Sequence, residues 1–392
     1  MISANITCSY DPCQQNLFIM KTTTRLCFIT SIALLSFIME GCTQKEFTWT
    51  NPLNGLEFRD THIIPHDGRF YAVGTCEPFW GGPNPGVKLY SSDDLRNWKF
   101  EKLLIDAFAL DSNVWYRDRF WAPELRKIGS TWYLTFNCQN NSGSYADPDM
   151  KHFHACGVAT ASEITGPYTV RTHEKPLTSF PSNDISLFED EDNRVYAFFN
   201  NGWTNIHKIF VAELDTVTVT LKEEPVELFS QSSGSAWDSN GIEGAHVIKH
   251  EGTYYLFYSS WTMGYAVGYA TATNVYGPWK KYDKNPLFGA YSRDGKSYIV
   301  REGVVIEDPQ SPLINAGHNQ VFTGPDGRMW TSYHGNIKGE AKTKTLIDPL
   351  WFEEGVIKTT APGYTTRSVP IAQKMLRRFP GLAMTENRKL TE

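Results

Sequence analysis

A turn followed by a short aromatic strand occurs five times along this chain, at intervals of about 60 to 75 residues. Five matching units of short strands, with no helical periodicity between them, indicate radial repetition rather than a β-sandwich. The sequence therefore predicts an all-β fold, a five-bladed β-propeller. The five units are residues 68–73, 129–134, 193–198, 252–257 and 327–332.

The length and the charge of the chain limit the remaining possibilities. A propeller blade needs about 40 to 50 residues, so a chain of 392 residues has length to spare for loops. The net charge is −6 and no long basic run occurs, so nucleic acid is not expected as a partner. Aromatic residues make up 14% of the chain, which suits either a β-rich core or a site that stacks on sugars.

The N-terminal part is typical of a targeting segment. Lys21 and Arg25 precede an apolar run over residues 26–39, which ends at Gly41-Cys42. The pattern resembles a bacterial lipoprotein signal, in which the cysteine becomes the lipidated first residue, and a buried N-terminal helix is the alternative. We expect a targeting segment over residues 1–42 and a single five-bladed β-propeller domain over 43–392. The protein would be lipid-anchored in the cell envelope (outer membrane or periplasm) or secreted, and would touch a membrane only through that anchor.

Only Cys76, Cys138 and Cys156 follow Cys42. Three thiols are too few for a disulfide framework, and the sequence leaves open whether Cys138 and Cys156 pair. The basic tail over residues 374–389 is expected to form a closing strand and a frayed end.

Three acidic residues stand at the entrance of predicted strands. Asp60 precedes the first aromatic strand, Asp184 the third and Glu243 the fourth. The inner strands of a propeller border a central channel, so we expect these carboxylates to converge. One protonated acid and one ionised base are what glycoside hydrolysis requires, and a third carboxylate raises the pKa of the acid. The alternative for each residue is an exposed position in a turn.

Five motifs in this order resemble glycoside hydrolase family 43, over about residues 52–364. They are Asp60, Trp121-Ala122-Pro123-Glu124, Asp184-Ile185-Ser186-Leu187-Phe188, Ile242-Glu243-Gly244-Ala245-His246 and Gly317-His318-Asn319-Gln320-Val321-Phe322. The resemblance implies the five-bladed propeller and inverting hydrolysis of arabinose- or xylose-containing polysaccharides. It makes Asp60 the general base, Asp184 the modulator of the acid's pKa and Glu243 the general acid.

The same resemblance bears on cofactors. His318 matches a histidine near a bound calcium or other cation at the channel axis, while a buried histidine bonded to a backbone carbonyl is the alternative. No cofactor is expected to be required for the chemistry. Thr61, Ile185 and Ala245 stand where the family usually has proline, which keeps a catalytically inactive, glycan-binding propeller as an alternative function.

Candidate substrate contacts come from tryptophans and loops. Trp80, Trp121 and Trp237 are predicted sugar platforms, with a place in the core as the alternative for each. The polar insertions over residues 81–86 and 139–154 are expected to wall the site into a pocket, which favours exo action. We expect a monomeric α-L-arabinofuranosidase with a carbohydrate substrate; β-xylosidase and endo-arabinanase activities are the alternatives within the family.

Overall fold

The computed structural model describes residues 45–79, 83–140, 154–202 and 204–383. The predicted targeting segment with Cys42, Trp80, and residues 81–82 and 141–153 of the polar insertions lie outside the described residues, so those predictions stay predictions. Among the described residues no helix is long and apolar enough to cross a membrane.

Antiparallel strands make up most of the described chain, and five of the sheets hold four strands or more. The first holds β2 (Arg59–His66), β3 (Arg69–Thr75), β4 (Gly86–Ser92) and β5 (Lys99–Asp106), and the second holds β6 (Tyr116–Ile128), β7 (Thr131–Asn140), β8 (His154–Ala161) and β9 (Thr169–Val170). The third holds β10 (Ser182–Glu189), β11 (Val195–Asn201), β12 (Lys208–Asp215), β13 (Thr220–Leu221) and β14 (Val226–Ser230).

The fourth sheet is the longest of the five, with seven strands. It holds β15 (Glu243–His250), β16 (Thr253–Ser260), β17 (Ala266–Ala272), β18 (Lys280–Lys281), β19 (Phe288–Arg293), β20 (Lys296–Arg301) and β21 (Val304–Glu307). The fifth holds β22 (Leu313–Thr323), β23 (Met329–Ile337), β24 (Thr343–Glu353) and β25 (Val356–Thr359).

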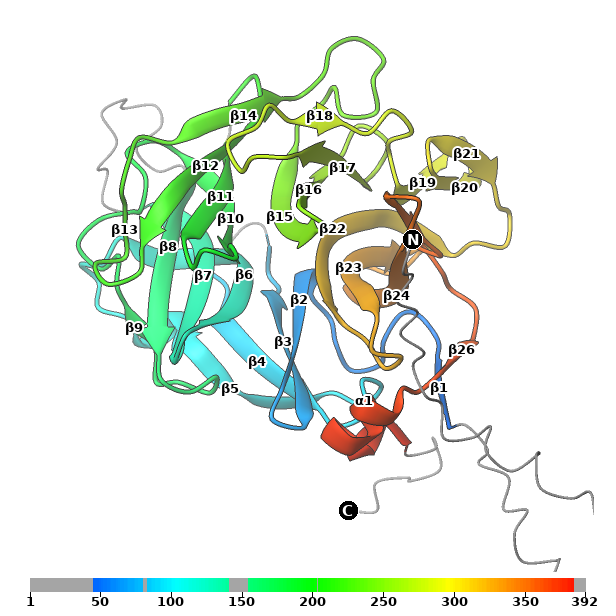
Figure 1. Ribbon diagram of the computed structural model, residues 1–392, viewed down its shortest axis with the longest axis horizontal. Helices are drawn as coiled ribbons and strands as arrows, with labels where there is room; N and C mark the ends of the chain where they lie inside the picture. Colours follow the sequence, from blue (N-terminus) through cyan, green and yellow to red (C-terminus); the bar gives the residue numbers. More distant parts are fainter. Residues whose placement is uncertain (1–44, 80–82, 141–153, 203, 384–392) are drawn as a thin grey trace, which may run out of the picture. The chain divides into compact units, whose positions relative to one another are not determined.

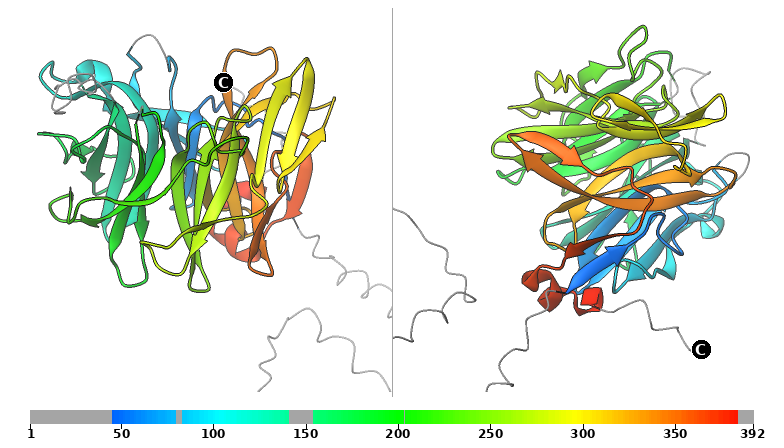
Figure 2. Two further views of the ribbon diagram at one scale, coloured as in Figure 1. Left: turned by 90° about the horizontal axis from the view of Figure 1, so that it is seen from above. Right: turned by 90° about the vertical axis from the view of Figure 1, so that its right-hand side faces the viewer.

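The first strand of each sheet lies near a common centre, and the later strands lie further out (Figure 1). The order of contacts between these inner strands is closed, since β2 contacts β6, β6 contacts β10, β10 contacts β15, β15 contacts β22 and β22 contacts β2. Figure 2 shows the sheets side by side when the same assembly is turned. The arrangement is an all-β propeller, which confirms the predicted class.

Each predicted turn-plus-strand unit forms the second strand of a sheet, in β3, β7, β11, β16 and β23. The aromatic and branched residues of these strands alternate between the two faces, so each sheet contributes to two apolar clusters between neighbouring sheets. Trp132, Tyr196, Phe257 and Trp330 are fully or almost fully buried in this way. The core thus consists of layers between sheets, and the centre is left to polar side chains.

Every inner strand carries a bulge at the same place. The pairing register shifts over a corresponding three-residue step in each of β2, β6, β10, β15 and β22; β6 has two further shifts and β22 has one. Inside each step one residue has a positive φ: Asp60 (52°), Ala122 (41°), Asp184 (53°), Gly244 (66°) and His318 (53°). A bulge of this kind redirects side chains, and here it turns them toward the centre.

The described cysteines are free and buried. Cys138 packs in the cluster between the first and second sheets, whereas Cys156 packs in the cluster between the second and third. The two thiols face opposite sides of one sheet, which excludes a bond between them.

The two ends of the described chain close the ring. Strand β1 (Glu46–Trp49) pairs with β26 (Arg367–Pro370) in a sheet of two strands. Residues 373–378, where a strand was expected, form helix α1 (Gln373–Arg378). The prediction was wrong because the apolar residues Ala372, Met375, Leu376 and Phe379 follow the spacing of one helical face and pack in the apolar cluster around Phe70 and Phe47. Two 3₁₀ turns, η2 (Ala107–Ala109) and η3 (Pro380–Ala383), complete the structure.

Candidate active site

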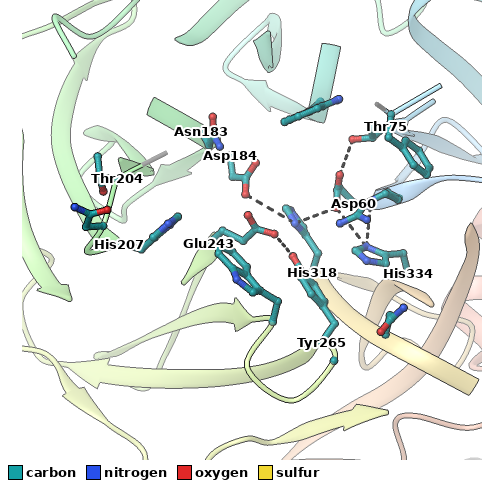
Figure 3. Close-up of a pocket in the computed structure, with 17 residues that line it drawn as sticks. Asp60, Thr75, Asn183, Asp184, Thr204, His207, Glu243, Tyr265, His318 and His334 are labelled. Carbon is teal, nitrogen blue, oxygen red and sulfur yellow. Dashed lines mark hydrogen bonds and ion pairs between the residues drawn. The ribbon is translucent and has the colours of Figure 1, made fainter. Parts of the chain in front are cut away.

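The three predicted carboxylates meet in one pocket of about 700 Å³. Asp60 comes from β2, Asp184 from β10 and Glu243 from the start of β15. Figure 3 shows their side chains around His318, which lies between Asp60 on one side and Asp184 and Glu243 on the other. The bulges therefore bring together residues that are up to 258 positions apart in the sequence, from Asp60 to His318.

Asp60 is held among hydrogen-bond donors and basic side chains. The Thr75 hydroxyl donates to Oδ2 at 2.5 Å, and the backbone N–H of Ala122 donates to Thr75 Oγ1 at 2.7 Å. His318 Nδ1 lies 3.1 Å from Oδ1, and Arg59 Nε lies 4.0 Å from the same oxygen. Burial alone would raise the pKa of Asp60, but His318, His334 and Arg59 outweigh it and hold the pKa well below its usual range. Asp60 is therefore ionised, as a general base must be.

Asp184 has the opposite electrostatic surroundings. The Gly244 N–H donates to its Oδ2 at 3.1 Å, and its own N–H donates to Asn137 Oδ1 at 3.1 Å. Burial, followed by the nearby charges of Glu243 and Asp60, raises the pKa of Asp184 well above its usual range. This carboxyl therefore resists ionisation next to the other two.

Glu243 is the first residue of β15 and pairs with Ser259 of β16. The Tyr265 hydroxyl donates a hydrogen bond to Glu243 Oε1 (Figure 3). The next residue, Gly244, has a φ of 66°, and a Cβ there would lie 3.1 Å from the His318 ring. The glycine after the acid thus makes room for His318.

His318 joins the acids and is a candidate cation ligand. Its backbone N–H donates to Ser259 Oγ at 2.9 Å. Its buried ring nitrogen Nδ1 faces the carboxylates of Asp60 and Asp184 and has no backbone carbonyl as partner. Asp184, Glu243 and His318 each offer one ligand atom, and these atoms lie within 4.8 Å of one another. Two carboxylate oxygens and an imidazole nitrogen are a donor set that fits a divalent cation.

The predicted tryptophans have different fates. Trp121 lines the pocket, and its ring stacks on His154 at 3.9 Å between centroids. Trp237 lies outside the pocket, because its ring packs on Tyr258 at 5.2 Å and over Gly268, where a Cβ would meet it at 2.4 Å. The prediction that Trp237 is a sugar platform is therefore corrected to a core role. Trp80 lies outside the described residues.

Several pocket residues were not predicted from the sequence: Arg59, Thr75, Phe79, His207, Trp261, Tyr265 and His334. Thr75 ends β3 opposite Arg59, and Tyr265 directly precedes β17 at the same end of its sheet as Glu243. Once an acid is placed at one end of an inner strand, the antiparallel pairing indicates which residues of the next strands lie beside it. That signal was present in the sequence.

Glu124, from the Trp-Ala-Pro-Glu motif, lies below the pocket in a second polar layer. It accepts hydrogen bonds from Ser186 Oγ at 2.8 Å and from Gln320 Nε2 at 2.5 Å. Burial raises its pKa to about 7. The residues two positions beyond each bulge form this layer: His62, Glu124, Ser186, His246 and Gln320.

Known proteins resemble the chain in sequence and in fold. A xylosidase/arabinosidase 43B from Humicola insolens is 27% identical over 278 residues, which cover 67% of this chain and 45% of that protein. An extracellular endo-alpha-(1->5)-L-arabinanase from Thermotoga petrophila is 22% identical, over 87% of this chain and 78% of that protein. A crystal structure of a thermostable family-43 glycoside hydrolase superposes with a TM-score of 0.67 at 26% identity, over 83% of this chain and 99% of that one.

The chain spans about half the length of the first curated relatives that it matches. The model of the glycosyl hydrolases family 43 matches residues 49–357, which is most of the chain. The family predicted from the motifs is thereby confirmed, and the chain belongs to glycoside hydrolase family 43.

Proposed function

We propose that the protein is an inverting, exo-acting α-L-arabinofuranosidase that removes arabinose from plant polysaccharides or oligosaccharides. The observation that carries the proposal is the pair of carboxyls with opposed protonation, since the pKa of Asp60 is lowered and that of Asp184 is raised within one pocket. Titratable groups whose surroundings push their pKa values apart are the usual mark of acid–base assignments.

In the proposed mechanism Glu243 protonates the glycosidic oxygen as the bond to the sugar breaks. Asp60 takes a proton from the water that attacks the anomeric carbon from the opposite face. This single displacement requires the two carboxyl groups to stand roughly 6.5 to 9.5 Å apart, with room for the water. Asp184 transfers no proton to or from the substrate; as the proposed modulator it stands beside Glu243 and accepts the Gly244 N–H, so the two carboxyls resist carrying a negative charge at the same time.

The proposal includes a propeller of five blades. It is supported by the five sheets of at least four strands, by the closed order of contacts between β2, β6, β10, β15 and β22, and by one bulge with a positive φ in each of these strands. A crystal structure with any other number of inner strands around the axis would reject it.

The arabinofuranoside specificity is supported by side chains that line the pocket and suit a sugar ring. Phe79, Trp121, Trp261 and Tyr265 give apolar faces of the kind on which sugar rings stack, beside polar Asn183 and Asn315. The names of the relatives also favour β-xylosidase and endo-arabinanase activities, which are the second candidates. A glycan-binding module without activity remains as a candidate of a different class.

The test is hydrolysis of 4-nitrophenyl α-L-arabinofuranoside, β-D-xyloside and β-D-galactoside, with Glu243→Gln as the inactive reference. Release from the arabinofuranoside, lost in the variant, is the expected result. Release from the xyloside alone would reverse the order of the two exo activities. Silence on all three together with cleavage of linear arabinan would indicate an endo enzyme, and binding of arabinan without cleavage would indicate the module.

A structural calcium or other divalent cation is proposed at the channel axis, beside His318. It would reduce the mutual repulsion of the carboxylates, and the proposed proton transfers do not pass through it. Dialysis against EDTA should then lower the melting temperature and turnover together, and added Ca²⁺ should restore both. Unchanged melting and turnover, with no calcium by elemental analysis, would reject the site.

The lipid anchor at Cys42 and the monomeric state are proposed on the sequence alone. A bacterial host that expresses the full chain should incorporate labelled palmitate into the wild type and not into Cys42→Ser. Light scattering should give the mass of one chain for the protein that begins at Thr43.

A further inference from the structure

Tyr265 lies beside the proposed acid and has no role in the mechanism so far. It directly precedes β17, two strands away from Glu243 in the same sheet. Its hydroxyl donates to Glu243 Oε1. A carboxyl has two oxygens, so a donor fixed on Oε1 leaves Oε2 to carry the acid proton.

The Tyr265 ring is buried and closely packed by its neighbours. Only 4% of the residue is exposed, and its ring lies 5.0 Å from the His334 ring between centroids. A Cβ at Gly317 would stand 2.2 Å from Tyr265 Cδ1, so only glycine at that position leaves space for the ring. This close packing against His334 and Gly317 leaves the ring little freedom to move, which fixes the direction of the hydroxyl.

The hydroxyl also remains a donor under working conditions. A phenol has an ordinary pKa of about 10, so the buried Tyr265 hydroxyl keeps its proton at neutral pH. A hydrogen bond from a neutral hydroxyl to a carboxyl strengthens when the carboxyl becomes ionised. The bond therefore grows stronger as Glu243 gives up its proton, which is the condition for an interaction that favours the transition state.

We propose that Tyr265 is a positioning residue that aims the Oε2 proton of Glu243 at the glycosidic oxygen and stabilises the carboxylate left behind. The inference rests on the proposed function, because it needs Glu243 as the acid. It predicts an effect that depends on the leaving group, since a good leaving group departs without protonation and a poor one does not.

The experiment compares Tyr265→Phe with wild type on aryl glycosides of one sugar that carry 2,4-dinitrophenol, 4-nitrophenol or phenol. We expect kcat to fall about 10- to 100-fold for the phenyl glycoside, less than the roughly 10²- to 10⁴-fold that the proton transfer itself contributes, and less than about threefold for the dinitrophenyl glycoside. The dissociation constant for free L-arabinose should be unchanged. Gly317→Ala keeps the hydroxyl and displaces the ring, and it should show the same dependence on the leaving group.

Tyr258→Phe is the matched control, since its buried hydroxyl donates to Asp238 at 3.1 Å in the same sheet and away from the pocket. It should lower stability without changing the dependence on the leaving group. Equal loss on all three glycosides, or no loss with Tyr265→Phe, would overturn the inference alone. A wild type with no turnover, or Glu243→Gln with full turnover on the phenyl glycoside, would overturn the proposed function as well.

Discussion

Asp60 and Asp184 occupy the same backbone position in two different sheets, yet their surroundings move the pKa of each carboxyl in opposite directions. Both stand at the bulge of an inner strand, with φ of 52° and 53°, and both are similarly buried, at 7% and 8% exposure. Asp60 faces His318, Arg59 and the Thr75 hydroxyl, whereas Asp184 faces Glu243 and the Gly244 N–H and lies further from His318 Nδ1, at 4.0 Å against 3.1 Å for Asp60. Burial is therefore not what distinguishes a base from a neutral acid here; the sign of the neighbouring charges is.

The largest expected effect comes from removing the charge of Asp60. Asp60→Asn keeps the shape and takes away the base, so turnover should fall by about 10²- to 10⁴-fold on substrates with good and poor leaving groups alike. Steady-state hydrolysis of the preferred aryl glycoside measures it. Asp192→Asn, an exposed carboxylate paired with Arg194, is the control. If turnover of Asp60→Asn stayed near that of the wild type, and if added azide gave no glycosyl azide of inverted configuration, another residue would have to be the base.

Asp184→Asn should have a smaller effect on turnover, of about 10- to 100-fold, because this carboxyl moves no proton and general acid–base transfer accounts for about 10²- to 10⁴-fold. The sharper contrast lies in stability. The raised pKa means that ionising Asp184 costs the folded state free energy, and the cost grows as pH rises through the interval between the unfolded and folded values.

Urea unfolding from pH 4 to pH 8 should therefore favour Asp184→Asn over wild type increasingly with pH. Asp60→Asn should behave in the opposite way. The lowered pKa of Asp60 contributes stability that is fully present above the unfolded value of about 3.9 and is lost as pH falls below it. The deficit of Asp60→Asn relative to wild type should therefore stay constant from about pH 5 upward and shrink when the scan is extended down to about pH 3. If the stability of the two variants changed with pH in the same way, the contrast between Asp60 and Asp184 would be refuted.

Thr75→Val tests one donor of the Asp60 site at nearly constant volume. It removes the hydrogen bond to Oδ2 and leaves the Ala122 N–H without its acceptor. The ionised form of Asp60 loses a donor, so its pKa should rise and the acidic limb of the kcat/KM profile should move to higher pH. We expect a destabilisation of about 1–3 kcal/mol, measured by urea unfolding. Thr331→Val, buried in β23 outside the pocket, controls for loss of a buried hydroxyl.

The smallest effect on turnover is expected from Glu124→Gln. Glu124 is buried like Asp184 but has only neutral donors, Ser186 and Gln320, with Arg126 and His246 further away. Burial raises its pKa from the usual 4.5 to about 7, so stability should decrease as pH rises between these values and level off above 7. The variant should lose that dependence while kcat stays within about twofold. If the slope of stability against pH were unchanged in the variant, the hydrogen bonds from Ser186 and Gln320 would be enough to offset the effect of burial on the pKa of Glu124.

Much of the fold followed from the sequence because its signal was local and repeated. The turn-plus-strand units at Gly68, Gly129, Asn193, Gly252 and Gly327 each became the second strand of a sheet. The acids were found because they stand at the start of the strands before these units. Thr75, His334 and Tyr265 were missed, because their roles depend on which side chain faces them across the axis. Trp237 was misassigned for the same reason, since a tryptophan in a core and one in a pocket look alike in sequence.

The bulge of the inner strands also restricts which amino acids can serve as acid or base. A positive φ is tolerated by glycine and, among the other residues, best by aspartate, asparagine and histidine. The five bulge positions hold Asp60, Ala122, Asp184, Gly244 and His318, so four of them obey that preference. The longer glutamate stands one residue earlier, at position 243, where the φ is not positive. The backbone thus assigns short acids to the bulge and the long acid to its flank, and the reach of each carboxylate follows from where its residue type can stand.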